Sequence, residues 1–346
     1  MSNNIKIIKE LKKEGHSICV FELTCADGTS ATISNYGCTI MKLLVNDKNG
    51  KLRDIVLGFD TIEEYFGKYY QKNYPYFGTV IGRYANRIKG GLFKLDNTTV
   101  HPTKNKGNNT LHGGAAGFDK KVWDVIELND TQHPSITMQY ISPDGEEGFP
   151  GSVTTRFTFS LLPASFQYRI EADSNKATAV NLTYHPYFNL DKNHASVGQQ
   201  KAKIYASHWL EQDEEFCVTG KLIPVDRSHY DFRDWQPVVQ QWNTEEGYDQ
   251  TFVASKNNDS LSIVAEALSS DETLHMQILS TQPVVHFYTG KWIPAVIGKN
   301  KETYGPFSGY CFETHSHPNA VNIPDFPDSI LRPGEVCKQT TIYKFK

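Results

Sequence analysis

The run Arg156-Phe157-Thr158-Phe159-Ser160-Leu161 alternates polar and apolar residues along its whole length. Successive side chains of a strand point to opposite faces of a sheet, so this alternation predicts a strand with one buried face. The run Ser135-Ile136-Thr137-Met138-Gln139-Tyr140 repeats the pattern, and Phe166, Tyr168 and Ile170 do so with polar residues between them. Half-buried strands of this kind are typical of antiparallel sheets.

Turn signals separate the predicted strands, and helix signals are few. The turns are Ala26-Asp27-Gly28, Asp47-Lys48-Asn49-Gly50, Pro143-Asp144-Gly145 and Arg332-Pro333-Gly334. The clearest helix signal covers only residues 61–66, where Thr61 can cap a first turn that carries two glutamates. Residues 192–198 and 298–303 resemble polar loops, and no linker or internal repeat divides the chain. We predict a single domain over residues 1–346, mostly β, built as a large antiparallel β-sandwich with few short helices.

The composition is that of an ordinary soluble protein, with 39% hydrophobic and 21% charged residues and a formal net charge of -4. This charge gives no reason to expect a nucleic acid or an anionic membrane as a partner. Residues 1–15 are polar and lysine-rich, without the apolar core of a secretory signal, and no run approaches the ~20 apolar residues of a membrane span. The 6 cysteines are scattered without a CxxC pair, which indicates free thiols in a reducing compartment. We expect a cytoplasmic protein.

One histidine stands in a strand-like aromatic stretch, Asn181-Leu182-Thr183-Tyr184-His185-Pro186-Tyr187-Phe188-Asn189-Leu190. Partial desolvation in such a setting shifts the pKa of an imidazole and can suit it to proton transfer near neutral pH. Taken alone, the stretch favours a structural histidine in the core, held by one backbone hydrogen bond. Its chemistry depends on whether His185 has companions.

Two glycine-rich segments carry polar groups suited to a polyhydroxylated ligand. Residues 82–91 (GRYANRIKGG) place Asn86 and Arg87 between glycines, where a forked donor and an amide can fix sugar hydroxyls. A surface turn with solvated arginines is the alternative. His112 precedes two glycines, so backbone or ligand can approach it closely, unless it is a turn histidine exposed to water.

Two carboxylates and one further histidine follow aromatic or apolar residues. Asp249 begins an apolar run after Tyr248, His286 lies in a strand-like segment, and Glu313 follows Phe312. Burying an unpaired carboxylate is costly, so Glu313 must reach a cleft or have a strong partner.

Other kinds of site have little support. The pair at 315 and 317 has the HxH spacing, but no HxxxH motif or acidic pair stands near it, so we predict no metal site. The sequence also lacks a phosphate-binding glycine loop and a GxSxG nucleophile elbow.

Taken together, these motifs resemble those of the aldose 1-epimerases, also called galactose mutarotases. The matching stretches follow the family's order from about Tyr36 to the end of the chain: GRYANRI (82–88), LHGG (111–114), GFDKKVW (117–123), SPDGEEGFPG (142–151), NLTYHPYFNL (181–190), GYDQTF (247–252), FYTG (287–290), FET (312–314) and LRPGE (331–335).

The resemblance implies an isomerase with an open sugar-binding cleft across one sheet of the sandwich. Members interconvert the α and β anomers of free hexoses such as D-galactose and D-glucose, by acid/base ring opening and reclosure. They use neither metal nor organic cofactor. The expected partner is a small-molecule hexose, with no nucleic acid or membrane, and the chain is expected to be a monomer or homodimer.

The resemblance also implies roles for single residues. Glu313 matches the catalytic base, His185 the acid, and His112 the second catalytic histidine. Sugar-hydroxyl ligands match Asn86, Arg87 and Asp249. The attraction of Glu313 is expected to raise the pKa of His185.

The chain departs from the family pattern around two of these histidines. Tyr184 and Pro186 flank His185 in place of the family's asparagine and serine, and His286 replaces a glutamine. We expect His286 to bind a sugar hydroxyl and to affect the preference among hexoses.

Three alternatives stay open. The chain is a sugar-binding module that has lost turnover, or an epimerase of a hexose 6-phosphate, or a glycoside hydrolase that uses Glu313 with Asp249. The two histidines that accompany the glutamate favour the epimerase over the hydrolase.

Overall fold

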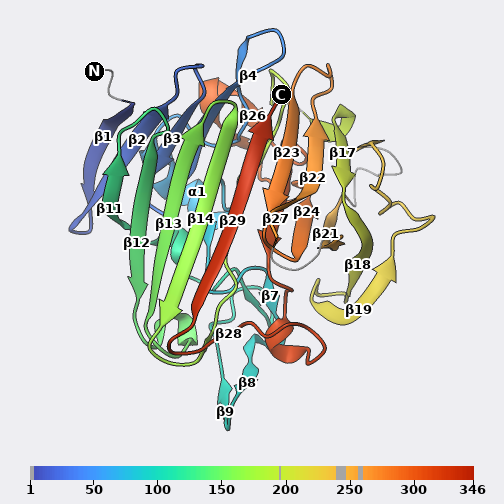
Figure 1. The fold of residues 1–346 in the computed structure, drawn as a ribbon. Helices are drawn as coiled ribbons and strands as arrows, with labels where there is room; N and C mark the ends of the chain where they lie inside the picture. Colours follow the sequence, from blue (N-terminus) through green and yellow to red (C-terminus); the bar gives the residue numbers. More distant parts are fainter. Residues whose placement is uncertain (1–3, 195, 239–246, 256–259) are drawn as a thin grey trace.

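The largest element is an antiparallel nine-stranded sheet, which crosses the front of the molecule in Figure 1. The computed structural model describes residues 4–194, 196–238, 247–255 and 260–346. In order across the sheet, the strands are β11 (Asp124–Asn129), β12 (Ser135–Ser142), β13 (Val153–Leu162), β14 (Ser165–Ser174), β29 (Val336–Phe345), β23 (His275–Ser280), β22 (Ser262–Leu268), β17 (Lys201–Ile204) and β20 (Gln236–Pro237).

Two five-stranded antiparallel sheets accompany it. One contains β1 (Ile5–Lys13), β2 (His16–Thr24), β3 (Ser30–Ser34), β4 (Ile40–Asn46) and β5 (Leu52–Asp54). The other has the order β19 (Val218–Pro224), β18 (Ala206–Gln212), β21 (Asp249–Ala254), β24 (Val284–Tyr288) and β27 (Cys311–His315).

Short strand pairs lie outside these three sheets. They are β6 (Val80–Ile81) with β16 (Thr183–Tyr184), β7 (Arg87–Ile88) with β10 (Thr110–Leu111), β8 (Phe93–Leu95) with β9 (Thr98–Val100), β15 (Thr178–Ala179) with β28 (Ile330–Leu331), and β25 (Val296–Ile297) with β26 (Thr303–Tyr304).

The helices are all short, as predicted. They are the single turn α1 (Lys68–Lys72) and the 3₁₀ helices η1 (Ile62–Phe66), η2 (Lys89–Gly91), η3 (Phe118–Lys120), η4 (Glu146–Gly148), η5 (Val197–Gln199), η6 (Lys299–Lys301) and η7 (Ala320–Asn322). The predicted helix at 61–66 is the 3₁₀ helix η1, and Glu64 caps it by accepting the Thr61 backbone N–H at 2.9 Å. None of the described helices is long and apolar enough to cross a membrane.

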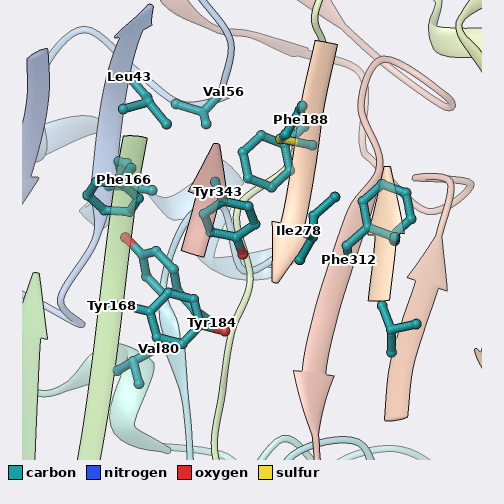
Figure 2. Packing of buried hydrophobic residues seen from close by; sticks show 14 of the residues in the cluster. Leu43, Val56, Val80, Phe166, Tyr168, Tyr184, Phe188, Ile278, Phe312 and Tyr343 are labelled. Carbon is teal, nitrogen blue, oxygen red and sulfur yellow. The ribbon is translucent and has the colours of Figure 1, made fainter. Parts of the chain in front are cut away.

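The alternation predicted from the sequence is confirmed in β13 and β14, where every second side chain is buried. Phe157 of β13 stacks on Tyr168 of β14, with ring centroids 5.4 Å apart. Figure 2 shows Phe166 and Tyr168 of the large sheet in one core with Leu43 of β4 and Phe312 of β27. Burial of these rings between the sheets is the main stabilising contribution that the sequence pattern encodes.

Tyr184 belongs to this core and not to a ligand site. Its ring is fully buried 5.3 Å from that of Tyr168, and its hydroxyl donates to the Cys38 carbonyl at 3.2 Å. The six cysteines all lie among the described residues and are free thiols, as predicted.

The two segments predicted to be polar loops meet at a buried charge cluster. His194 Nδ1 lies 2.6 Å from Glu302 Oε2. The Lys299 ammonium donates to Asp54 Oδ2 at 2.6 Å and to the carbonyls of Met41 and Val56. These contacts hold η6 against β4 and β5.

Replacing Lys299 should lower the stability of the protein far more than replacing a lysine of an exposed ion pair with the same N···O distance. Lys299→Met leaves Asp54 and two carbonyls unpaired in the interior, which should cost about 3–5 kcal/mol of the free energy of unfolding. Lys176 also lies 2.6 Å from an aspartate, Asp144, but its side chain is 56% exposed against 3% for Lys299. Lys176→Met should change stability little. Urea unfolding of both variants checks this expectation, and equal losses would contradict it.

Candidate active site

A pocket of about 460 Å³ brings together every site residue predicted from the sequence. It is lined by Asn86, Arg87, His112, His185, Asp249, His286 and Glu313, among other residues. Their chemical roles stay predictions, as does the open cleft across one sheet, but residues as far apart in the chain as Asn86 and Glu313 line one pocket.

Strand register explains the floor of this pocket. In β27, Glu313 pairs with His286 of β24, and His286 pairs with Thr251 of β21. Cross-strand partners project from the same face of a sheet, so the three side chains share the pocket face. Phe312 alternates to the other face and joins the core.

His185 follows β16 and enters the pocket from the side. Its backbone N–H donates to the Thr79 carbonyl at 3.0 Å, and its own carbonyl accepts the Gly78 N–H at 3.1 Å. Its ring is buried with Nε2 3.4 Å from Glu313 Oε1. Glu313 therefore has His185 as a close partner, and His185 is not isolated in the core, although its catalytic role stays a prediction.

The Glu313 carboxylate raises the His185 pKa, as expected, but the net shift has the opposite direction. Burial lowers this pKa, and the opposing attraction of Glu313 does not fully offset the loss of hydration. A lowered pKa reduces the population of imidazolium at neutral pH, but it makes the imidazolium a stronger acid.

His112 is a neutral hydrogen-bond donor. The backbone N–H of Asn86 donates to His112 Nδ1 at 3.2 Å, and a backbone N–H can only donate. Nδ1 is therefore unprotonated and Nε2 carries the proton. Burial also lowers the His112 pKa well below its ordinary value. A water-exposed turn histidine is excluded, because His112 is buried.

The glycines after His112 allow the close approach that the sequence indicated. A Cβ on Gly113 would lie 2.0 Å from the carbonyl oxygen of Gly82, and φ at Gly113 is +86°. Only glycine fits there, so this turn can pack directly on the segment that carries Asn86 and Arg87.

Three pocket groups lie close enough together to be considered as metal ligands. Within the described part of the chain, donor atoms of His112, His185 and Glu313 all lie within 4.8 Å of one another. The Asn86 N–H, however, leaves the proton on Nε2 of His112, so this nitrogen has no lone pair for a cation. The arrangement suits hydrogen bonding and proton transfer better than metal binding.

His286 is engaged with protein groups through both ring nitrogens. Nε2 lies 2.8 Å from Asp249 Oδ1, and Nδ1 lies 2.8 Å from Thr251 Oγ1. Burial by itself would raise the pKa of Asp249, but the His286 hydrogen bond and the charges of His286 and Arg87 lower it overall. In this geometry His286 supports Asp249 and also lines the pocket, so its expected contact with a sugar hydroxyl stays a prediction.

The two arginines of residues 82–91 have different environments. Arg83 donates to Ser142 Oγ and to the carbonyls of residues 142, 143, 150 and 151, so it is structural. Arg87 is buried over the Phe216 ring at 5.3 Å, and its Nε has no hydrogen-bond partner among the described residues. Nor does Glu313 Oε2. Unsatisfied buried groups of opposite charge suit a pocket that binds a polar ligand.

Sequence reasoning missed the aromatic part of the lining. Tyr76, Tyr187, Tyr288, Phe216 and Trp292 all border the pocket. The Tyr76 ring stacks near His185 at 6.0 Å and meets His112 edge-on at 4.8 Å. Tyr288 was detectable, because it lies two residues after His286 on the same strand face. Tyr76 belongs to an irregular segment with φ of +61°, which no periodicity reveals.

Comparison with known proteins agrees with the resemblance. Residues 20–344 match the family described as aldose 1-epimerase. Human galactose mutarotase is 38% identical over 348 residues, covering 98% of this chain and 97% of its own. The aldose 1-epimerase of Escherichia coli K12 is 31% identical and covers 97% of each chain.

Solved structures agree as well and confirm the predicted β-rich fold. A galactose 1-epimerase from Lactobacillus acidophilus superposes with a TM-score of 0.86 at 25% identity, covering 100% of this chain and 99% of its own. An aldose epimerase homologue from C. elegans has a TM-score of 0.85 at 29% identity, covering 94% and 98%. This chain therefore belongs to the aldose 1-epimerase family.

Proposed function

We propose that this protein is an aldose 1-epimerase that interconverts the α and β anomers of free hexoses such as D-galactose and D-glucose. The proposal rests on one observation, which is that Glu313 Oε1 and His185 Nε2 lie 3.4 Å apart in the pocket. Ring opening requires a proton to leave O1 and another to reach the ring oxygen. Both oxygens are bonded to C1, so a base and an acid must lie close together at that carbon.

The proposed reaction begins with ionised Glu313 and protonated His185. Glu313 takes the proton of the O1 hydroxyl, the C1=O1 bond forms, and the C1–O5 electron pair goes to O5, which takes the Nε2 proton of His185. The free aldehyde turns about the C1–C2 bond. The ring then closes on the other face of C1, with Glu313 returning its proton to O1 and His185 recovering its proton from O5.

His112 would assist at the ring oxygen. Its Nε2–H is the only ring proton it has, because Nδ1 accepts from Asn86. A fixed neutral donor stabilises negative charge as it develops on O5 without competing as a base.

Arg87 and Asp249 would hold the sugar hydroxyls. The Arg87 guanidinium offers a fork of donors, and Asp249 keeps a second oxygen besides the one that His286 holds. The aromatic rings supply apolar surface for the C–H faces of the sugar. We propose that the whole chain acts as one cytoplasmic domain, as a monomer or homodimer, without metal or organic cofactor.

The glycoside hydrolase alternative fits the pocket poorly. A hydrolase needs a protonated carboxylic acid with a raised pKa opposite its second carboxylate. The Asp249 pKa is lowered and its carboxylate is paired with His286. The group that faces Glu313 is an imidazole.

A hexose 6-phosphate is a second candidate substrate. Lys72 and Lys106 are exposed and belong to the pocket lining, where either ammonium can pair with a phosphate. A comparison of kcat/KM for D-glucose and D-glucose 6-phosphate separates the candidates. A kcat/KM at least tenfold higher for D-glucose 6-phosphate would show that hexose phosphates, and not free hexoses, are the substrate class.

Glu313→Gln should lower kcat for mutarotation by about 10²- to 10⁴-fold, because it removes the base and keeps the shape of the side chain. Polarimetry of freshly dissolved α-D-galactose measures the rate, and saturation-transfer NMR measures binding. Binding should persist. A near-normal rate would contradict the base assignment.

Galactose binding by the wild-type protein without acceleration of mutarotation would instead establish a sugar-binding module.

Asp249→Asn should act mainly on binding. We propose that Asp249 binds sugar hydroxyls and does not contact C1 or O5. KM for galactose should therefore rise about tenfold while kcat changes by less than about threefold. Asp124→Asn, at an exposed position in β11, is the matched control and should leave both constants unchanged. A loss confined to kcat would place Asp249 in the proton-transfer machinery.

A further inference from the structure

Cys311 lies against the proposed catalytic acid. Its Sγ is 3.3 Å from His185 Nδ1, on the side of the ring away from Glu313. Both residues are buried. In β27, Cys311 and Glu313 project from the same face, and Cys311 pairs with Tyr288 of β24. One strand therefore presents a carboxylate to Nε2 and a thiol to Nδ1 of the same imidazole.

Packing alone would give Cys311 a simpler role. It belongs to an apolar cluster with Tyr187, Tyr288 and Tyr304, where a small aliphatic side chain would also fit. An aliphatic group, however, would remove the sulfur that lies 3.3 Å from Nδ1 and leave this nitrogen more poorly satisfied in a dry environment. Such a nitrogen loses the hydration that stabilises its proton.

The reaction needs a proton on Nδ1 throughout. The imidazolium carries protons on both nitrogens, and after Nε2 has given its proton to the sugar, the neutral ring must keep Nδ1–H. Nδ1 therefore needs an acceptor in both states, and Cys311 Sγ lies within reach of it, in addition to a hydrogen bond between the ring and the backbone of His185 itself. Burial raises the pKa of the Cys311 thiol well above its ordinary value, so the sulfur is a neutral, weak acceptor.

We propose that Cys311 is a positioning residue that accepts the Nδ1–H of His185 and so directs proton exchange through Nε2. This inference rests on the proposed function. A carboxylate at this place would hold the imidazolium proton strongly, whereas a thiol stabilises it only weakly. The weak acceptor keeps His185 able to release its proton to the ring oxygen.

His112 and His185, two of the histidines that line the pocket, would then differ in what contacts Nδ1. His112 meets a backbone donor and keeps its proton on Nε2, whereas His185 meets an acceptor and can give its Nε2 proton away. This difference makes His112 a fixed hydrogen-bond donor and His185 a proton carrier, although both residues are histidines.

Other groups around His185 also influence its titration. They are Glu313 of β27, His286 of β24, Asp249 of β21 and a backbone hydrogen bond of His185 itself. The other titratable groups that face the ring or line the same pocket are Cys311, His112, Tyr76, Tyr187 and Tyr288. The test therefore changes only Cys311 and reads the ionisation of His185 directly.

NMR titration of the His185 imidazole in the ligand-free protein is the first measurement. Cys311→Ala removes the acceptor and should lower the His185 pKa by roughly half a unit to one unit. Cys311→Ser supplies a stronger acceptor and should raise it. Cys25→Ala, a buried cysteine in a different sheet environment near Gln132, is the control and should leave it unchanged. This readout does not require turnover, so it separates the inference from the proposed function.

Mutarotation kinetics are the second measurement. Cys311→Ala should lower kcat about tenfold with KM within about twofold, and the alkaline limb of kcat should move to lower pH because less His185 stays protonated. Cys311→Ser should restore kcat to within about threefold of the wild type. An unchanged His185 pKa in both variants, or equal loss of kcat in both, would reduce Cys311 to packing and overturn the proposal.

Discussion

The Glu313 carboxylate is buried beside an imidazole, and its Oε2 has no hydrogen-bond partner among the described residues. Such a group is costly, and the fold retains it through the register of β27 against β24. The same register places His286 beside Glu313 and Tyr288 beside Cys311. The energetic cost of burying Oε2 without a partner is offset only when a ligand supplies the missing hydrogen bond.

The three histidines around this carboxylate differ through their neighbours. A backbone N–H fixes the tautomer of His112, Cys311 contacts His185, and Asp249 with Thr251 holds His286. Identical side chains can therefore serve as donor, acid and support. The environment of Nδ1 or Nε2 decides the role in each case.

Local sequence patterns predicted the long alternating strands, and the motifs with their family resemblance supplied the polar residues of the pocket, but neither supplied its aromatic lining or the long-range contacts. Alternation identified β13 and β14 because one face of each must be buried. The partner of His185 Nδ1 was not predictable, since a lone cysteine has no pattern. The sequence indicated that Glu313 raises the His185 pKa but not that burial outweighs this effect, because depth of burial cannot be read from spacing. Lys299 was placed in a polar loop, although tertiary packing buries its ammonium beside Asp54.

The most direct test of ring opening by Glu313 and His185 compares α-D-galactose with methyl α-D-galactoside. The glycoside has no proton on O1, so a base at Glu313 cannot open its ring. Proton NMR of the anomeric signals should show rapid exchange of the free sugar and an unchanged glycoside, with no methanol released. Anomerisation or hydrolysis of the glycoside would contradict the account, because it would place the chemistry at the C1–O1 bond.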